Sequence, residues 1–212
     1  MRKYILLLCI AILLTGCTRV DNQEEYSKIS NEIINNSTRL TNTTTKGYKY
    51  YLPKGATLIY NSNFNQKIRI LEHDLYLYVD IVSYYYKKSL TINKSEFNYY
   101  FSMIANKNKS GYIGINKEDD SYFVKIVYNY AKIEFYTDKE NLSNLVAYAT
   151  LIAANIEYND ILILEIIEDN DIKSSDTIYS ILKPNDSESK FNEYLEEYVQ
   201  EDEKIEALPD EY

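Results

Sequence analysis

The chain has 212 residues, of which 45% are hydrophobic, so it is long enough for one domain with a substantial apolar core. Its net charge is −9, and residues 193–212 alone hold nine acids and one lysine. A protein that binds nucleic acid needs a clustered basic surface, and because the sequence shows none we expect no nucleic-acid partner. Neither half alternates strands with helices, which argues against a two-lobed α/β solute-binding protein.

The start of the chain has the pattern of an export signal. Arg2 and Lys3 provide a positive start, and residues 4–14 form an unbroken apolar run. In a helix this run would cover about half of the ~30 Å hydrocarbon core of a membrane, so it is too short for a stable span. Its length is typical of the apolar part of a signal peptide.

The apolar run ends in Leu14-Thr15-Gly16-Cys17, which resembles the lipobox of bacterial lipoproteins at all four positions. The resemblance implies that residues 1–16 are a signal peptide and that the Cys17 thiol is the lipid attachment site, converted to a diacylglyceryl thioether. Two acyl chains anchor a protein stably. The expected partner is therefore the cell membrane, with the protein lipid-anchored on its extracytoplasmic face. Cys9 directly follows three leucines, with no small residue before it, and is expected to be a small hydrophobe of the leader.

Removing a 16-residue leader from the 212-residue chain leaves 196 residues and no cysteine to pair with Cys17, so no disulfide is expected. Residues 17–46 are polar and are predicted to be a lipidated tether, in which apolar residues at helical spacing indicate a short amphipathic helix near 24–36. Residues 47–199 are predicted to form the globular domain. Residues 200–212 are predicted to be an acidic disordered tail.

Strands are predicted in the first part of the globular domain. Two short ones, at 57–60 and 67–72, precede a long one at 75–86, which has one aliphatic and one tyrosine-rich face. Residues 97–137 are typical of a meander with polar turns at 106–111 and 117–121. The pair Asn129-Tyr130 is either a hairpin turn or a bulge in one long strand.

Helices are predicted after the strands. Asp138 is expected to cap a helix whose apolar residues repeat at three and four positions from Leu142 to Ile156. Residues 161–167 are either a buried strand or a second helix, and 189–199 fit a last helix. The fold class is therefore predicted as α+β, an antiparallel sheet of about five to six strands with the C-terminal helices packed on one face.

Known catalytic and metal-binding patterns are missing from the sequence. The loop that begins at Asn106 resembles a calcium loop in outline, but its twelfth position is Lys117 and its first, third and fifth positions hold no acid. His73 is the single histidine, and no Gly-x-Ser-x-Gly elbow accompanies it. We therefore assign no catalytic residue and expect neither a metal nor a cofactor.

The tyrosine-rich face of the long strand is the candidate binding surface. Tyrosine offers rigid contact area and a polar tip, which suits a protein or glycan partner. Two alternatives are open: helix 139–156 covers this face, or the 24 tyrosines reflect AT-rich codons. The candidate residues are Tyr76, Tyr78, Asp80, Tyr84 and Tyr86.

Three functions fit these observations. The first is a membrane-anchored extracytoplasmic lipoprotein with a non-catalytic binding or accessory module. The second is an extracytoplasmic hydrolase that works through a pair of carboxylates, with Asp80 as the residue to test. The third is an immunity-type protective lipoprotein.

Overall fold

The computed structural model describes residues 23–36 and 41–176. Cys17, the predicted helix at 189–199 and the acidic tail lie outside these residues. In the described part of the chain, no helix has the length and apolar character needed to cross a membrane.

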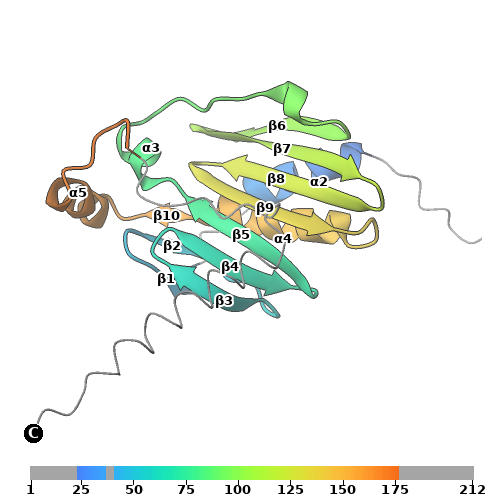
Figure 1. Ribbon diagram of the computed structural model, residues 1–212, viewed down its shortest axis with the longest axis horizontal. Helices are drawn as coiled ribbons and strands as arrows, with labels where there is room; N and C mark the ends of the chain where they lie inside the picture. Colours follow the sequence, from blue (N-terminus) through green and yellow to red (C-terminus); the bar gives the residue numbers. More distant parts are fainter. Residues whose placement is uncertain (1–22, 37–40, 177–212) are drawn as a thin grey trace, which may run out of the picture.

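The fold is built on a seven-stranded antiparallel sheet with the strand order β3-β4-β5-β9-β8-β7-β6 (Figure 1). This confirms the α+β class, with seven strands where about five to six were expected. The strands are β3 Thr57–Ser62, β4 Asn65–Ile70, β5 His73–Val79, β6 Tyr100–Asn106, β7 Lys109–Glu118, β8 Ser121–Tyr128 and β9 Ala131–Thr137. Hairpins join β6 to β9 in sequence, and β9 pairs with β5, so the chain must cross from β5 in the middle of the sheet to β6 at its edge.

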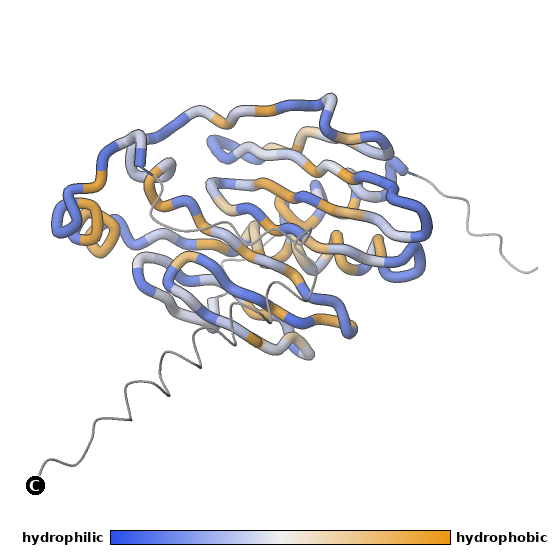
Figure 2. The backbone as a smooth tube through the Cα atoms, viewed as in Figure 1, coloured by the Kyte–Doolittle hydropathy of each residue, from blue (hydrophilic) through white to orange (hydrophobic). Residues whose placement is uncertain are grey.

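One face of this sheet is covered by α2 (Glu24–Asn36) and α4 (Leu142–Ala154) (Figure 1). Polar and apolar residues alternate along the central strands (Figure 2), and along β8 every second side chain is buried, so this strand turns its buried side chains towards these helices. The predicted apolar stripe of α4 is confirmed. The predicted cap is wrong, because Asn141 is the N-cap residue and the Asp138 carboxylate accepts the Asn141 backbone N–H at 2.9 Å.

Helix α2 has the bounds that its spacing predicts, but it is part of the domain. Tyr26, Ser30 and Ile34 are buried, and the Ser30 hydroxyl lies 2.9 Å from the Thr150 hydroxyl of α4. The prediction of a tether over 17–46 is therefore wrong for residues 24–36. The amphipathic pattern reflects a helix that buries its apolar side in the core, so the packed structure includes α2 and is not confined to residues from 47 onwards.

A small second sheet flanks the large one. It has the order β1-β2-β10 and is formed by β1 Thr43–Thr44, β2 Tyr48–Tyr50 and β10 Glu157–Tyr158. It therefore joins residues just after α2 to residues just after α4. The first strand lies within the predicted tether, so the tether prediction is also wrong for Thr43–Thr44.

Two alternatives left open by the sequence are decided by the structure. Asn129 and Tyr130 have φ of 50° and 63°, and they connect Tyr128 to its pairing partner Ala131. They are a two-residue hairpin turn, which requires left-handed backbone. Residues 161–167 are helical and belong to α5 (Asp160–Asp169).

Candidate functional site

The strand predicted at 75–86 ends at Val79, and the prediction is wrong from Asp80 onwards. Asp80 is the N-cap of a short helix, α3 (Ile81–Tyr85). One oxygen of its carboxylate accepts the Ser83 backbone N–H at 2.8 Å, and the other accepts the Ser83 hydroxyl at 2.7 Å. Aspartate is one of the preferred N-cap residues, a weak helix-start signal that the regular alternation of tyrosines concealed.

The change of direction at Asp80 separates the candidate tyrosines. Tyr76 and Tyr78 are half-buried on the face of β5 opposite to the buried Leu75 and Leu77. Since the aliphatic side is buried in the core that α4 completes, the alternative that helix 139–156 covers the tyrosine face is wrong. These two tyrosines belong to the outer face of the sheet.

Tyr84 and Tyr86 make different contacts. The Tyr84 ring stacks on Tyr158 with ring centroids 3.8 Å apart, and its hydroxyl donates to the Asp160 carboxylate at 2.7 Å. Burial and this carboxylate raise the pKa of Tyr84 to about 12, so the hydroxyl stays protonated at neutral pH. The Tyr86 hydroxyl donates to the Ile172 carbonyl oxygen at 2.7 Å. Both residues hold α3 against the C-terminal part of the domain.

Residues 87–99 form the crossover segment that carries the chain from α3 to β6 (Figure 1, green). Residues 89–96 are all exposed. The Phe97 ring occupies the space over Gly114 of β7, where any Cβ would overlap the ring. The absence of a side chain at Gly114 therefore lets the crossover segment lie close on the outer face of the sheet.

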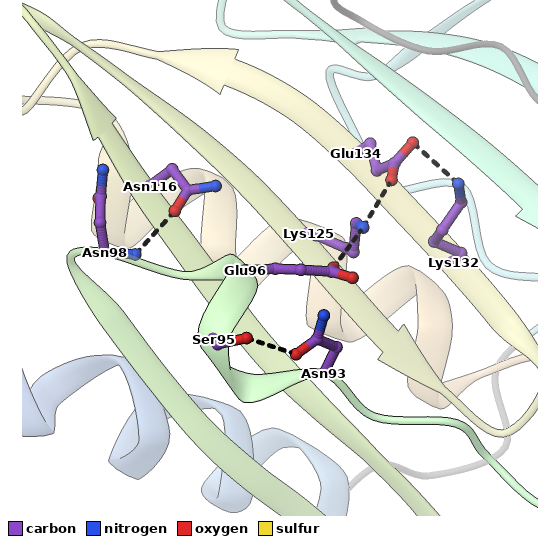
Figure 3. A network of polar contacts seen from close by, with 8 residues as sticks. All are labelled: Asn93, Ser95, Glu96, Asn98, Asn116, Lys125, Lys132 and Glu134. Atoms are coloured by element: carbon purple, nitrogen blue, oxygen red, sulfur yellow. Dashed lines mark hydrogen bonds and ion pairs between the residues drawn. The ribbon is translucent and has the colours of Figure 1, made fainter.

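Polar contacts hold the same end of the crossover segment (Figure 3). The Glu96 carboxylate lies 3.5 Å from the Lys125 ammonium on β8, which in turn lies 3.7 Å from Glu134 on β9. The Asn116 side chain accepts the Asn98 backbone N–H at 2.8 Å. The segment is thus fastened to the sheet through residues 96–98.

A cleft of about 680 Å³ lies where the other end of the crossover segment, residues 87–92, faces the sheet. Tyr78 and Asp80 line it from the end of β5, and Val127 and residues 129–132 line it from β8, β9 and the turn between them. Its volume falls within the roughly 300–1,000 Å³ that small-molecule sites occupy. Two of the five predicted site residues, Tyr78 and Asp80, are therefore brought together here, and the other three do not line the cleft.

The lining of the cleft is rich in lysine. Lys87, Lys88, Lys109 and Lys132 line it, and Asp80 is the single acid among its lining residues in the described part of the chain. Two of the lysines make cation–π contacts with tyrosine rings. The Lys87 ammonium lies 3.8 Å from the centroid of the Tyr84 ring, and the Lys132 ammonium lies 5.5 Å from that of Tyr78.

None of these four lysines is among the site residues predicted from the sequence. They come from three places in the chain, and only the adjacent pair Lys87-Lys88 marks one of them in the sequence. Nothing in the sequence indicates that Lys109 at the start of β7 and Lys132 on β9 line the same cleft as that pair. The pairing of β7, β8 and β9 brings Lys109 and Lys132 to one end of the sheet, where the crossover segment adds Lys87 and Lys88.

The carboxylate-hydrolase hypothesis is not supported by this cleft. Glycoside hydrolysis by two carboxyl groups needs them about 5–10 Å apart across the substrate. Asp80 is the only acid in the described lining, and both of its oxygens already accept hydrogen bonds from Ser83. His73 lies at the opposite end of β5, with Nε2 3.3 Å from the Asp138 carboxylate. In the part of the chain that the structure describes, no three His, Cys, Asp or Glu side chains converge as metal ligands.

Asp80→Ala is expected to lower the free energy of unfolding by about 1 kcal/mol, because it removes the cap of α3. Asp80→Asn is expected to cost less, since asparagine is an equally good N-cap residue. Chemical denaturation of both variants measures the difference. Equal losses for the two variants would show that the charge of Asp80, and not its capping role, is what the fold requires.

Comparisons of this chain with protein-family models, with curated protein sequences and with solved structures find no match, so the site is assigned from its own geometry.

Proposed function

We propose that this chain is a lipid-anchored extracytoplasmic binding protein, attached through Cys17, whose cleft beside the end of β5 holds a small ligand. The observation that carries the proposal is the cleft of about 680 Å³, which combines polar and apolar side chains on one concave surface. The lipobox resemblance of residues 14–17 supports the location.

The position of α2 indicates which end of the domain lies nearer to the proposed membrane anchor. The hydroxyl of Tyr26, near the start of α2, lies 3.4 Å from the Lys139 ammonium, just beyond the end of β9. Near the other end of α2, the Asn106 side chain donates to the Ile34 carbonyl oxygen at 3.0 Å. Since Asn106 precedes the β6–β7 turn, the start of α2 and the cleft are at opposite ends of the sheet.

The distance from the anchor to the domain is limited by the chain. Cys17 lies seven residues before Glu24, the first residue of α2. At about 3.5 Å per extended residue this stretch reaches no more than about 25 Å. A lipid on Cys17 therefore keeps the start of α2 within about 25 Å of the membrane, whereas the cleft lies at the opposite end of the sheet.

The test uses the full-length protein purified from membranes, with bound small molecules detected by native mass spectrometry. Met103 lines the cleft from the edge strand β6 and is 47% exposed. The unchanged protein is expected to retain a bound ligand. Met103→Asp is expected to abolish binding of this ligand, because it replaces an apolar contact by a negative charge.

Ile59 offers a matched control. It lies on the other edge strand, β3, it is 45% exposed, and it does not line the cleft. Ile59→Asp is expected to keep the ligand and, like Met103→Asp, to change the free energy of unfolding by less than about 0.5 kcal/mol. Loss of the ligand in both variants, or a ligand unaffected by Met103→Asp, would contradict the proposal.

A further inference from the structure

We infer that the cleft selects small organic anions that have an apolar body, such as carboxylates, sulfonates or phosphate esters of that form. This inference rests on the proposed function and adds the ligand class to it. Two independent features of the lining carry it: the balance of charge, and the position of the exposed apolar side chains.

The charge of the lining is opposite in sign to that of the protein. The chain carries −9 overall, whereas among the residues that the structure describes the cleft is lined by four lysines and one aspartate. The Lys132 ammonium lies 2.9 Å from the Glu134 carboxylate, so part of its charge is balanced from outside the lining. Among the described residues, the four lysines of the lining then stand against two carboxylates, those of Asp80 and Glu134.

The Asp80 carboxylate is occupied as the cap of α3, where both oxygens accept hydrogen bonds. It is therefore poorly placed to bind a cationic ligand. Lys88, after α3, and Lys109, at the start of β7, reach the cleft from separate elements. An anionic group bound between them would accept charge-assisted hydrogen bonds, which are roughly twice as strong as neutral ones.

The apolar part of the lining defines the rest of the ligand. Leu90 and Ile92 of the crossover segment are 38% and 39% exposed, and Met103 of β6 is 47% exposed. Single exposed apolar residues are normal on a protein surface, but these three gather in one cleft with Val127. A ligand that covers them while it reaches the lysines has an apolar body and an anionic head.

The experiment compares two probes that share an apolar body, naphthalene-2-sulfonate and the neutral naphthalene-2-sulfonamide. Isothermal titration calorimetry of the full-length protein in a non-ionic detergent, with a detergent blank, gives the dissociation constant for each probe. We expect the sulfonate to bind at least about tenfold more tightly, as a hydrogen bond to a charged group implies.

The lysines are tested by the double variant Lys88→Gln and Lys109→Gln. It is expected to remove most of the preference for the sulfonate and to leave the affinity for the sulfonamide unchanged. The matched control is the pair Lys54→Gln and Lys117→Gln, which removes the same charge from exposed positions outside the cleft and is expected to keep the preference. Higher salt should weaken binding of the sulfonate alone.

Several results would overturn the inference: equal affinity for the two probes, equal losses in both double variants, or no binding of either probe. If Met103→Asp weakens both probes while the lysine variants change neither, the cleft binds ligands without selecting anions. In that case the ligand class fails and the proposed function stands. The proposed function itself is tested separately, by whether the unchanged protein retains a ligand from cells.

Discussion

Cys17→Ser is expected to release the protein from the membrane almost completely. In the proposed arrangement the lipid on Cys17 is the attachment, and two acyl chains are what makes such an attachment stable. A serine hydroxyl does not replace the thiol as the site of the thioether. Labelling with a radioactive fatty acid, followed by separation of membrane and soluble fractions, measures both the loss of label and the loss of membrane binding.

Cys9→Ser is the control for this experiment. Cys9 lies inside the apolar run of the leader and has leucines at the three preceding positions, so its replacement is expected to leave both label and membrane binding intact. Continued labelling of the Cys17→Ser protein would show that the lipobox interpretation of residues 14–17 is wrong. The position of the cleft in the domain would be unaffected by that result.

Gly111→Ala is expected to destabilise the domain strongly. Gly111 of β7 pairs with Tyr128 of β8, and a Cβ there would overlap the Val127 carbonyl oxygen and lie 2.7 Å from the Tyr128 Cα. Both are backbone atoms of a central strand, so the two strands must separate locally. We expect a loss of at least about 3 kcal/mol in the free energy of unfolding, at the upper end of the range for overpacked cores.

Gly114→Ala offers a comparison on the same strand. The three atoms nearest to a Cβ at Gly114 all belong to the ring of Phe97, on the crossover segment, and a side-chain ring moves more easily than the backbone. The expected loss is about 1–2 kcal/mol. Adding Phe97→Ala should cancel the steric part of this loss and should have no such effect on Gly111→Ala. Thermal or denaturant unfolding gives the free energy of unfolding of the two single glycine variants and of the two double variants that also carry Phe97→Ala.

A finding that Gly111→Ala and Gly114→Ala cost the same, or that Phe97→Ala rescues both, would contradict the packing described for β7. The comparison also tests the crossover segment. If Phe97 did not pack on Gly114, its removal would leave the Gly114→Ala protein no more stable than before.

The sequence determined the class of the fold because that class depends on local patterns. The alternation along β8 and the stripe of apolar residues in α4 predict a strand and a helix, since each repeats with the period of its backbone. The spacing that predicts α2 has the same origin. What the sequence did not show was its role, because an amphipathic helix has the same pattern whether it lies in a tether or against a core.

The site depended on the tertiary structure. Tyr78 and Asp80 stand out in the sequence, and they do line the cleft. The alternation that links them to Tyr84 and Tyr86 continues past the end of β5, and only the hydrogen bonds between Asp80 and Ser83 show where the strand gives way to α3. A periodic pattern carries no information about such a change of direction.

The expected location of the protein follows from the sequence, whereas the chemistry of its cleft follows from the tertiary structure. Leu14-Thr15-Gly16-Cys17 is contiguous, so its resemblance to a lipobox is legible from the sequence alone. Lys88 and Lys109 are separated in the chain and become neighbours of one cleft only through the crossover segment and the order of strands in the sheet. Side chains that meet through long-range packing leave no local pattern, which is why the tertiary structure was needed to find this cleft.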